Sequence, residues 1–406
     1  MGVIETFQKL VQNKKPDSIW EKEVKRTSSK KWDSHSLNVL LKAILLLIER
    51  QVIVMKRKLF MCLLLLTLAC SALGIDYVYY GSVVPSDPAK NLGGVALKSN
   101  GDLYYVTFDS ATSILAYVAN AIPGVKTSAY TVSTISTETG IPDTGRGLND
   151  IDLDSAGNIY ICGTAASGSP SILKKFNAAP VHTEVWSQSI SDVRTNGIDV
   201  ISNDVLAVGT NFNVLAWKKT SDGTQYAANS VAFGDMYGRS ISLNTTNNDI
   251  YMGRNGNSVL DGLKVIYGGT PSNLSGYTNV LDHQLATNGA GSLYGFAMQP
   301  IDYDTNNNEL IAADIYDDGL ADTIQGVRIY GITFSGASTV FTQLQFFDGS
   351  TIPGRSGQYV NVFGISSNRI GGKDYLALAI GYGAPAAYAI DILVRPSAGL
   401  GDWDMY

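Results

Sequence analysis

Oxygen-bearing side chains recur near the starts of apolar segments in the first half of the chain. Asn149 and Asp150 open one such segment, Asn196 and Asp199 lie in the next copy of the same pattern, and Arg146 precedes the first pair. A hydrolase working at a shared axis would need several convergent carboxylates. The sequence places at most Asp150 and Asp199 there, and the two asparagines are expected mainly to satisfy backbone groups.

A second group of candidate ligands lies in the later part of the chain. Asp302, Asp304 and Asn306 alternate as in the opening of a calcium-binding loop, and Asp314 and Asp317 follow after one apolar segment. This spacing suits Ca²⁺, although the Gly and the bidentate Glu of an EF-hand loop are absent. Two interpretations stay open, a structural calcium site and a solvated turn between strands.

Nucleophilic catalysis has little support in the sequence. From Ile75 onward the only histidines are His182 and His283, and no Gly-x-Ser-x-Gly elbow leads into a helix. Cys162 lies in a predicted strand without a neighbouring basic residue to lower its pKa, so it is expected to be a buried apolar side chain. The sequence therefore favours a protein that is not an enzyme.

The charge distribution limits the class of partner. Residues before Ile75 hold 13 of the 30 Lys and Arg and 6 of the 36 Asp and Glu, which leaves a net charge of −13 from Ile75 onward. Nucleic-acid binding, which depends on basic patches, is not expected. Tyr237, Tyr294 and Tyr359 could instead form an aromatic surface for a protein or carbohydrate partner.

A repeated unit must position these residues. An apolar pair, a turn rich in Asn, Asp and Gly, and an apolar-Tyr-apolar segment appear clearly at 94–106 and 150–161. The pattern predicts two strands joined by a tight turn, with a third and sometimes a fourth strand after them. Six copies recur at spacings of 43 to 67 residues, taking as equivalent Val95, Ile151, Ile198, Ile241, Phe296 and Phe363.

These copies predict an all-β fold, a six-bladed β-propeller with four-stranded blades over residues 75–406. The last copy ends with the strand-like segment 387–394 and then lacks an outer strand. The alternating segment 75–80, which precedes the first copy, is expected to fill that place and so join the two ends of the ring.

The copies resemble the repeats of NHL-type six-bladed propellers, and segment 151–161 carries the closest match. Two segments are also similar to the gluconolactonase and regucalcin-like propellers, which hold a divalent cation, commonly Ca²⁺, at the axis. Segment 146–150 resembles their Arg-Pro-Asn-Asp-Gly phrase, and segment 195–198 resembles the phrase that carries a metal-binding Asn. The resemblance makes Asn196 a ligand equivalent, but Gly93 and Arg239 occupy the regions of the family's Glu and Asp ligands.

The first 74 residues indicate export. Residues 55–74 combine a basic start, an apolar run and small residues, as in a secretory signal peptide. Cys70 ends a segment that resembles a bacterial lipobox, so a lipid anchor is an alternative to release. Residues 1–54 are expected to be an upstream extension that precedes the true start at Met55, with a basic cytoplasmic tail as the alternative.

The sequence thus favours an exported, non-catalytic propeller that binds a protein or glycan and is secreted, periplasmic or at the cell surface. A metal-dependent, lactonase-like hydrolase that uses the central funnel is the first alternative. A structural component of the cell surface is the second. Ca²⁺ is the one cofactor with any support, and contact with a membrane is expected only through the anchor at Cys70.

Overall fold

The structure is a computed structural model, and it describes most of the chain after residue 76. The described residues are 77–87, 90–107, 112–139, 147–163, 171–190, 195–210, 214–226, 230–232, 237–255, 263–283, 298–314, 326–348, 351–355, 360–382 and 387–395. The predicted signal peptide, Cys70 and residues 1–54 lie outside them. Within these ranges no helix has both the length and the apolar character needed to cross a bilayer.

Six four-stranded antiparallel sheets form the propeller. Blade 1 contains β2 (Leu92–Leu97), β3 (Leu103–Thr107), β4 (Thr112–Val118) and β5 (Val132–Thr139). Blade 2 contains β6 (Leu148–Leu153), β7 (Ile159–Gly163), β8 (Ser171–Phe176) and β9 (Glu184–Ile190). Blade 3 contains β10 (Thr195–Ser202), β11 (Val205–Thr210), β12 (Val214–Lys219) and β13 (Val231–Ala232).

The remaining blades follow the same order along the chain. Blade 4 contains β14 (Tyr237–Leu243), β15 (Ile250–Asn255), β16 (Leu263–Tyr267) and β17 (Asn279–His283). Blade 5 contains β18 (Met298–Asp304), β19 (Glu309–Asp314), β20 (Gly326–Thr333) and β21 (Val340–Asp348). Blade 6 contains β22 (Val360–Ile370), β23 (Lys373–Tyr382), β24 (Ala387–Arg395) and β1 (Val78–Val83). The described residues also include three short helices, α4 (Ala121–Thr127), η1 (Leu274–Gly276) and η2 (Gly336–Ser338).

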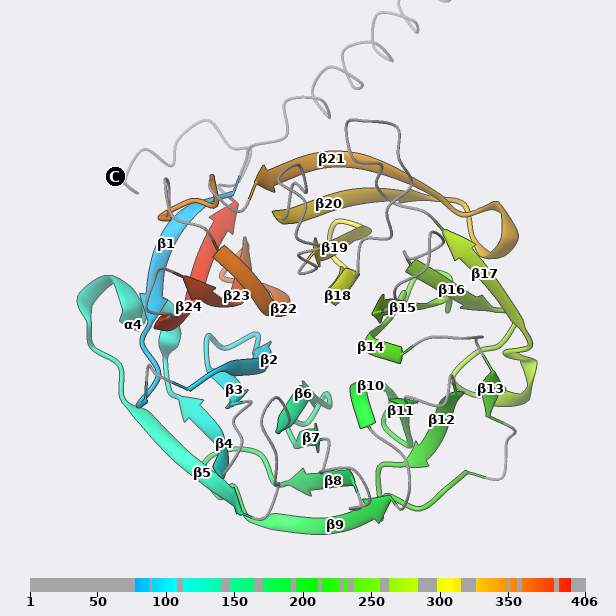
Figure 1. Cartoon of the computed structure of the whole chain (residues 1–406), viewed down its shortest axis with the longest axis horizontal. Helices are drawn as coiled ribbons and strands as arrows, with labels where there is room; N and C mark the ends of the chain where they lie inside the picture. Colours follow the sequence, from blue (N-terminus) through cyan, green and yellow to red (C-terminus); the bar gives the residue numbers. More distant parts are fainter. Residues whose placement is uncertain are drawn as a thin grey trace, which may run out of the picture. The chain divides into compact units, whose positions relative to one another are not determined.

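The blades surround a central axis, with β2, β6, β10, β14, β18 and β22 innermost (Figure 1). This arrangement confirms the predicted all-β, six-bladed fold. The predicted closure is also confirmed, because β1 pairs antiparallel with β24, with Val83 opposite Ile390. The innermost strand of blade 5 was predicted too early, however. That strand is β18. Ile301 pairs with Ala312 in blade 5 as Ile241 pairs with Met252 in blade 4, so Ile301 is the residue equivalent to Ile241. Phe296, the residue predicted for this position, lies outside the described residues.

The tyrosine of the repeated unit fills the space between blades. Tyr104 of blade 1 is fully buried in a cluster with Leu148 and Ile151 of blade 2. Tyr160 of blade 2 and Tyr251 of blade 4 pack in the same way against the blade that follows each of them. Cys162 is buried beside Tyr160, which confirms its predicted role as a packing residue. In blades 1, 2 and 4 an aromatic side chain of the hairpin thus links neighbouring blades through apolar burial, whereas Ala207, Ile311 and Ala377 stand at that position in the other three blades.

A buried ion pair reinforces the closure of the ring. Asp391 of β24 is 0% exposed and accepts two hydrogen bonds from the guanidinium of Arg355, each of 2.8 Å. Ser82 of β1 donates its hydroxyl to the same carboxylate at 2.5 Å. Arg355 also lies over the ring of Tyr382, 3.9 Å from its centroid. The strand that closes the ring is therefore tied to blade 6 by side chains as well as by its backbone ladder.

We predict that Arg355→Met lowers the free energy of unfolding by about 3–5 kcal/mol, because it leaves the Asp391 carboxylate buried without its cation. Urea denaturation of the protein measures the change. The double variant Arg355→Met/Asp391→Leu should recover most of the loss, since no buried charge remains. Arg369→Met is the matched control, because its side chain is 41% exposed and its pair with Asp374 should contribute about 1 kcal/mol or less. Equal losses in the two single variants would contradict this role of Arg355.

Candidate functional site

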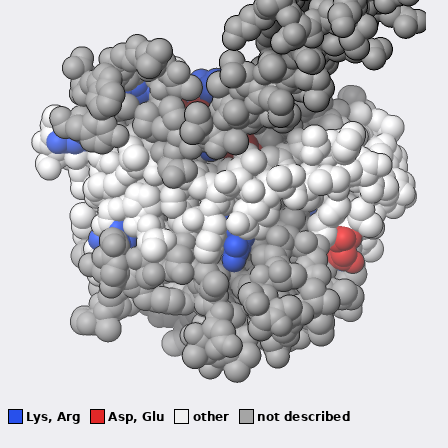
Figure 2. All heavy atoms as spheres, turned by 90° about the horizontal axis from the view of Figure 1, so that it is seen from above, with Lys and Arg blue, Asp and Glu red and all other residues white. Residues whose placement is uncertain are grey.

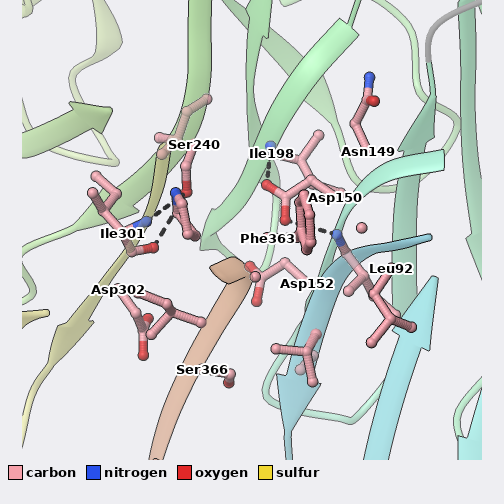
Figure 3. Close-up of a pocket in the computed structure, with 18 of the residues that line it drawn as sticks. Leu92, Asn149, Asp150, Asp152, Ile198, Ser240, Ile301, Asp302, Phe363 and Ser366 are labelled. Carbon is pink, nitrogen blue, oxygen red and sulfur yellow. Dashed lines mark hydrogen bonds between the residues drawn. The ribbon is translucent and has the colours of Figure 1, made fainter. Parts of the chain in front are cut away.

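A pocket lies on the axis, between the innermost strands of the six blades. Its volume is about 330 Å³, and every innermost strand contributes residues to its wall (Figure 3). The polar part of the wall comes largely from four carboxyl groups: Asp150, Asp152, Asp199 and Asp302. Isoleucines from several blades, together with Phe363 and Tyr388, form the apolar part. This size lies at the lower end of the range typical of small-molecule sites.

The polar side chains of the pocket wall accept hydrogen bonds from backbone N–H groups of the innermost strands. Each such strand pairs with only one neighbour, so alternate N–H groups on its free edge need other acceptors. The preceding blade supplies them. Asp199 accepts the N–H of Leu243 at 2.6 Å, and Ser242 of the next blade accepts the N–H of Tyr303 at 2.9 Å.

The same bond recurs at the equivalent position of further blades. Asp152 accepts the N–H of Val200 at 2.6 Å, Asp302 accepts the N–H of Ser367 at 2.5 Å, and Ser366 accepts the N–H of Leu97 at 3.0 Å. Asp150 and Ser240, two residues earlier in their strands, accept the N–H groups of Ile198 and Ile301. Five of the six contacts between neighbouring blades thus contain at least one such bond.

The contact between blades 1 and 2 is built differently. Ala96 stands where the other blades have Asp or Ser, and Gly94 stands where blade 2 has Asp150. A Cβ atom on Gly94 would lie 2.7 Å from Oδ1 of Asp150, so blade 1 cannot carry a side chain there without moving its neighbour. Blade 2 compensates internally, because Asp150 accepts the N–H of Ile151 at 2.9 Å.

Enclosure at the centre of the ring changes the acidity of these carboxyl groups. Burial raises the pKa of Asp150 to about 8, although the N–H groups of Ile198 and Ile151 act in the opposite direction. Burial likewise raises the pKa of Asp302 to about 6, against the opposing effect of its bonds to Ser367. The side chains of Asp150 and Asp302 are partly exposed, but the space they face is the central pocket, which the six blades enclose. Asp150 is therefore largely protonated at neutral pH.

The structure brings together four of the five residues expected in the funnel. Asn149, Asp150, Asn196 and Asp199 all line the pocket, and the amide of Asn149 donates to the carbonyl of Thr195 at 2.8 Å, which is a bond to backbone as expected. Arg146 lies outside the described residues. Sequence reasoning missed Asp152 and Asp302 as axial residues. Asp152 could have been found from its alignment with Asp199 in the repeat.

The segment compared with a calcium loop is divided between two locations. Asp302 faces the pocket, whereas Asp304 lies at the β18–β19 hairpin, where its oxygens accept from the Asn306 N–H at 2.8 Å and the Asn307 amide at 2.7 Å. The side chains of Asp314 and Asp317 lie outside the described residues. Among the described ranges, no group of three or more Asp, Glu, His and Cys side chains is arranged as a set of metal ligands.

The remaining candidates lie away from the axis or cannot be placed. The side chains of Tyr237, Tyr294 and Tyr359 are outside the described residues. His182 follows β8 and packs edge-on against Tyr117, with ring centroids 4.7 Å apart, and His283 packs against Phe341 of the next blade at 5.2 Å. Burial lowers the pKa of both histidines. Both are interblade packing residues, and neither lines the pocket.

The acidity of the pocket carboxyls predicts that the protein loses stability as the pH rises. A carboxyl whose pKa is higher in the folded state than in the unfolded state stabilises the fold at low pH, and this contribution is lost as the pH rises from the unfolded pKa to the folded pKa. We expect the melting temperature to fall between about pH 4, the ordinary pKa of Asp, and about pH 8, with Asp302 contributing up to about pH 6. Asp150→Asn should reduce the fall of the melting temperature between about pH 6 and about pH 8. Asp222→Asn is the control, because the pKa of Asp222 is lowered and the group is ionised throughout this range. A melting temperature that rises with pH would contradict the assignment.

Comparison with known proteins gives similarities of fold. No family model matches this chain, and no curated protein matches it. Among solved structures it is similar to the PQQ-bound form of an aldose sugar dehydrogenase from Streptomyces coelicolor, with 15% identity and a TM-score of 0.49 over 79% of this chain and 98% of that chain. It is also similar to a catalytically inactive virginiamycin B lyase from Staphylococcus aureus with quinupristin, with 11% identity and a TM-score of 0.46 over 77% and 97% of the two chains. At these identities neither similarity transfers an activity to this chain.

Proposed function

We propose that this protein is an exported, non-catalytic propeller that binds a carbohydrate in its central pocket. The observation that carries the proposal is a pocket with an apolar and aromatic wall whose acidic side chains already bond to the protein's own backbone. Sugars present apolar ring faces and many hydroxyl donors, which suit aromatic side chains together with carboxyl and amide oxygens. The export step rests on the signal-peptide pattern of residues 55–74.

Phe363 and Tyr388 are the side chains best placed to stack on a sugar ring. Both line the pocket, their ring centroids are 6.1 Å apart, and the rings are tilted by 52°. Gly381 makes room for both, because a Cβ atom there would lie 2.8 Å from the Tyr388 ring and 3.0 Å from the Phe363 ring. Asn149 and Asn196 line the same pocket and add amide oxygens as acceptors.

The charge of the pocket wall agrees with a neutral ligand. Figure 2 shows the propeller from its edge, away from the pocket, and there the described basic side chains are isolated from one another. The residues that line the pocket include no Lys, Arg or His. An anionic ligand such as a nucleotide would therefore meet carboxyl groups without a compensating cation.

A lactonase-like hydrolase is the second candidate, because four carboxyl groups converge on the axis instead of the two expected. The residues do not fit the axial cation of the gluconolactonase-like propellers. Gly93 and Arg239 occupy the regions of two of that family's acidic ligands, and the amide of Asn149 is bonded to backbone. A structural role at the cell surface, with or without a lipid at Cys70, is the third candidate, and self-assembly of the purified protein would favour it.

Calorimetric titration of the purified protein with a panel of neutral mono- and disaccharides tests the proposal. We expect binding of at least one sugar, a loss of about tenfold or more in affinity for Phe363→Ala, and little change for Phe334→Ala, whose aromatic side chain is 73% exposed on the hairpin after β20. Lactone hydrolysis that depends on an added divalent cation, with no sugar binding, would overturn the proposal in favour of the hydrolase. Metal content measured on the same sample would test whether Ca²⁺ binds at Asp302 or at Asp304, which lie in the pocket and at the β18–β19 hairpin respectively.

A further inference from the structure

Every innermost strand contains a β-bulge at the same position of the repeat. In β22 the register shifts between Val362 and Gly364, so Phe363 is the extra residue and has no partner on β23. The same shift in β6 and β10 makes Asn149 and Asn196 the extra residues. The equivalent positions in β2, β14 and β18 are those of Gly93, Arg239 and Gln299. We call these six positions the bulge ring.

The bulge ring forms part of the pocket wall. The extra residue of a bulge leaves the regular alternation of the strand, which re-aims its side chain, and bulges are common beside binding sites for this reason. Gly93, Asn149, Asn196 and Phe363 all line the pocket (Figure 3), while the other two side chains of the ring lie outside the described residues. The ring therefore presents glycine, amide and aromatic groups from different blades at one level of the pocket.

Phe363 and Asn196 lie on opposite sides of this ring. The innermost strands follow one another around the axis in chain order, so β22 and β10 are three blades apart in either direction and face each other across the pocket (Figure 1). Tyr388 lies beside Phe363 in blade 6, and Asp199 lies three residues after Asn196 in blade 3. An aromatic wall thus faces a wall that carries an amide and a carboxyl group.

A pyranose ring between two such walls fits best when its own two faces differ. In a β-glucoside every hydroxyl is equatorial, so both faces of the ring present C–H groups. In a β-galactoside the 4-hydroxyl is axial, so one face presents a hydroxyl and the opposite face presents C–H groups. The C–H face suits an aromatic ring through apolar contact, and the hydroxyl suits an amide or a carboxyl group.

We propose that the bulge ring selects a pyranose with an axial hydroxyl on one face, of which a β-galactoside is the type. The C–H face of the sugar stacks on Phe363, and the axial hydroxyl forms a hydrogen bond with the amide of Asn196 on the opposite wall. Gly93, next to Phe363 around the ring, leaves space for the sugar because it has no side chain. This inference rests on the proposed function, since it specifies the sugar that the same pocket takes.

Calorimetric titration of the purified protein with methyl β-D-galactopyranoside and methyl β-D-glucopyranoside tests the inference, because the two differ only at carbon 4. We expect the galactoside to bind at least about tenfold more tightly, since the glucoside leaves the polar wall facing C–H groups. Asn196→Ala should remove most of this preference. Asn203→Ala is the matched control, because Asn203 is an exposed asparagine in the β10–β11 turn of the same blade and does not line the pocket.

The comparison of the two glycosides on the wild type does not depend on the folding of any variant. Equal affinities, a preference for the glucoside, or a preference that Asn196→Ala leaves unchanged would overturn the inference and leave sugar binding itself in place. Binding of another sugar but of neither glycoside would also overturn the inference alone. Binding of no sugar at all would overturn the proposed function together with it.

Discussion

The unpaired inner edge of each blade is the constraint on which the rest of the structure depends. A propeller must end each sheet at the axis, and there the innermost strand has N–H groups with no neighbouring strand to accept them. In this protein the preceding blade supplies a side-chain oxygen at a fixed position of the repeat, as Asp199 does for Leu243. One set of bonds therefore satisfies the edges, fixes the spacing between blades and determines which side chains line the central pocket.

This constraint changes how the acidic pocket should be interpreted. A count of convergent carboxylates would distinguish an enzyme from a binding module only if those groups had no other task, and four such groups converge on the pocket. Each of them, however, bonds to backbone N–H groups of the next blade, and Ser242 and Ser366 perform the same task elsewhere in the ring. Since serine can replace aspartate in this role, convergence at the axis follows from the architecture. The apolar and aromatic part of the wall is what remains to select a ligand.

The repeat was sufficient to predict the number of blades, their four strands and the closing strand, because each depends on hydrophobic alternation and turn composition. The axial side chains were harder to predict, because they depend on the register of each innermost strand. Blade 5 shows why. With Phe296 as the equivalent residue, Asp302 falls beside the turn and becomes a candidate either for a calcium ligand or for a solvated turn residue. With Ile301 in that place, Asp302 aligns with Asp152 and Asp199.

The difference between Asp150 and Ser240 follows from how many N–H groups each side chain serves. Ser240 accepts only the N–H of Ile301. Asp150 follows a blade that has Gly94 at the equivalent position, and it accepts the N–H of its own neighbour Ile151 as well as that of Ile198. Two acceptor atoms are then needed, which a carboxyl supplies with a fixed geometry. The glycine of blade 1, where a Cβ atom would lie 2.7 Å from Oδ1 of Asp150, thus accounts for the aspartate that it faces in blade 2.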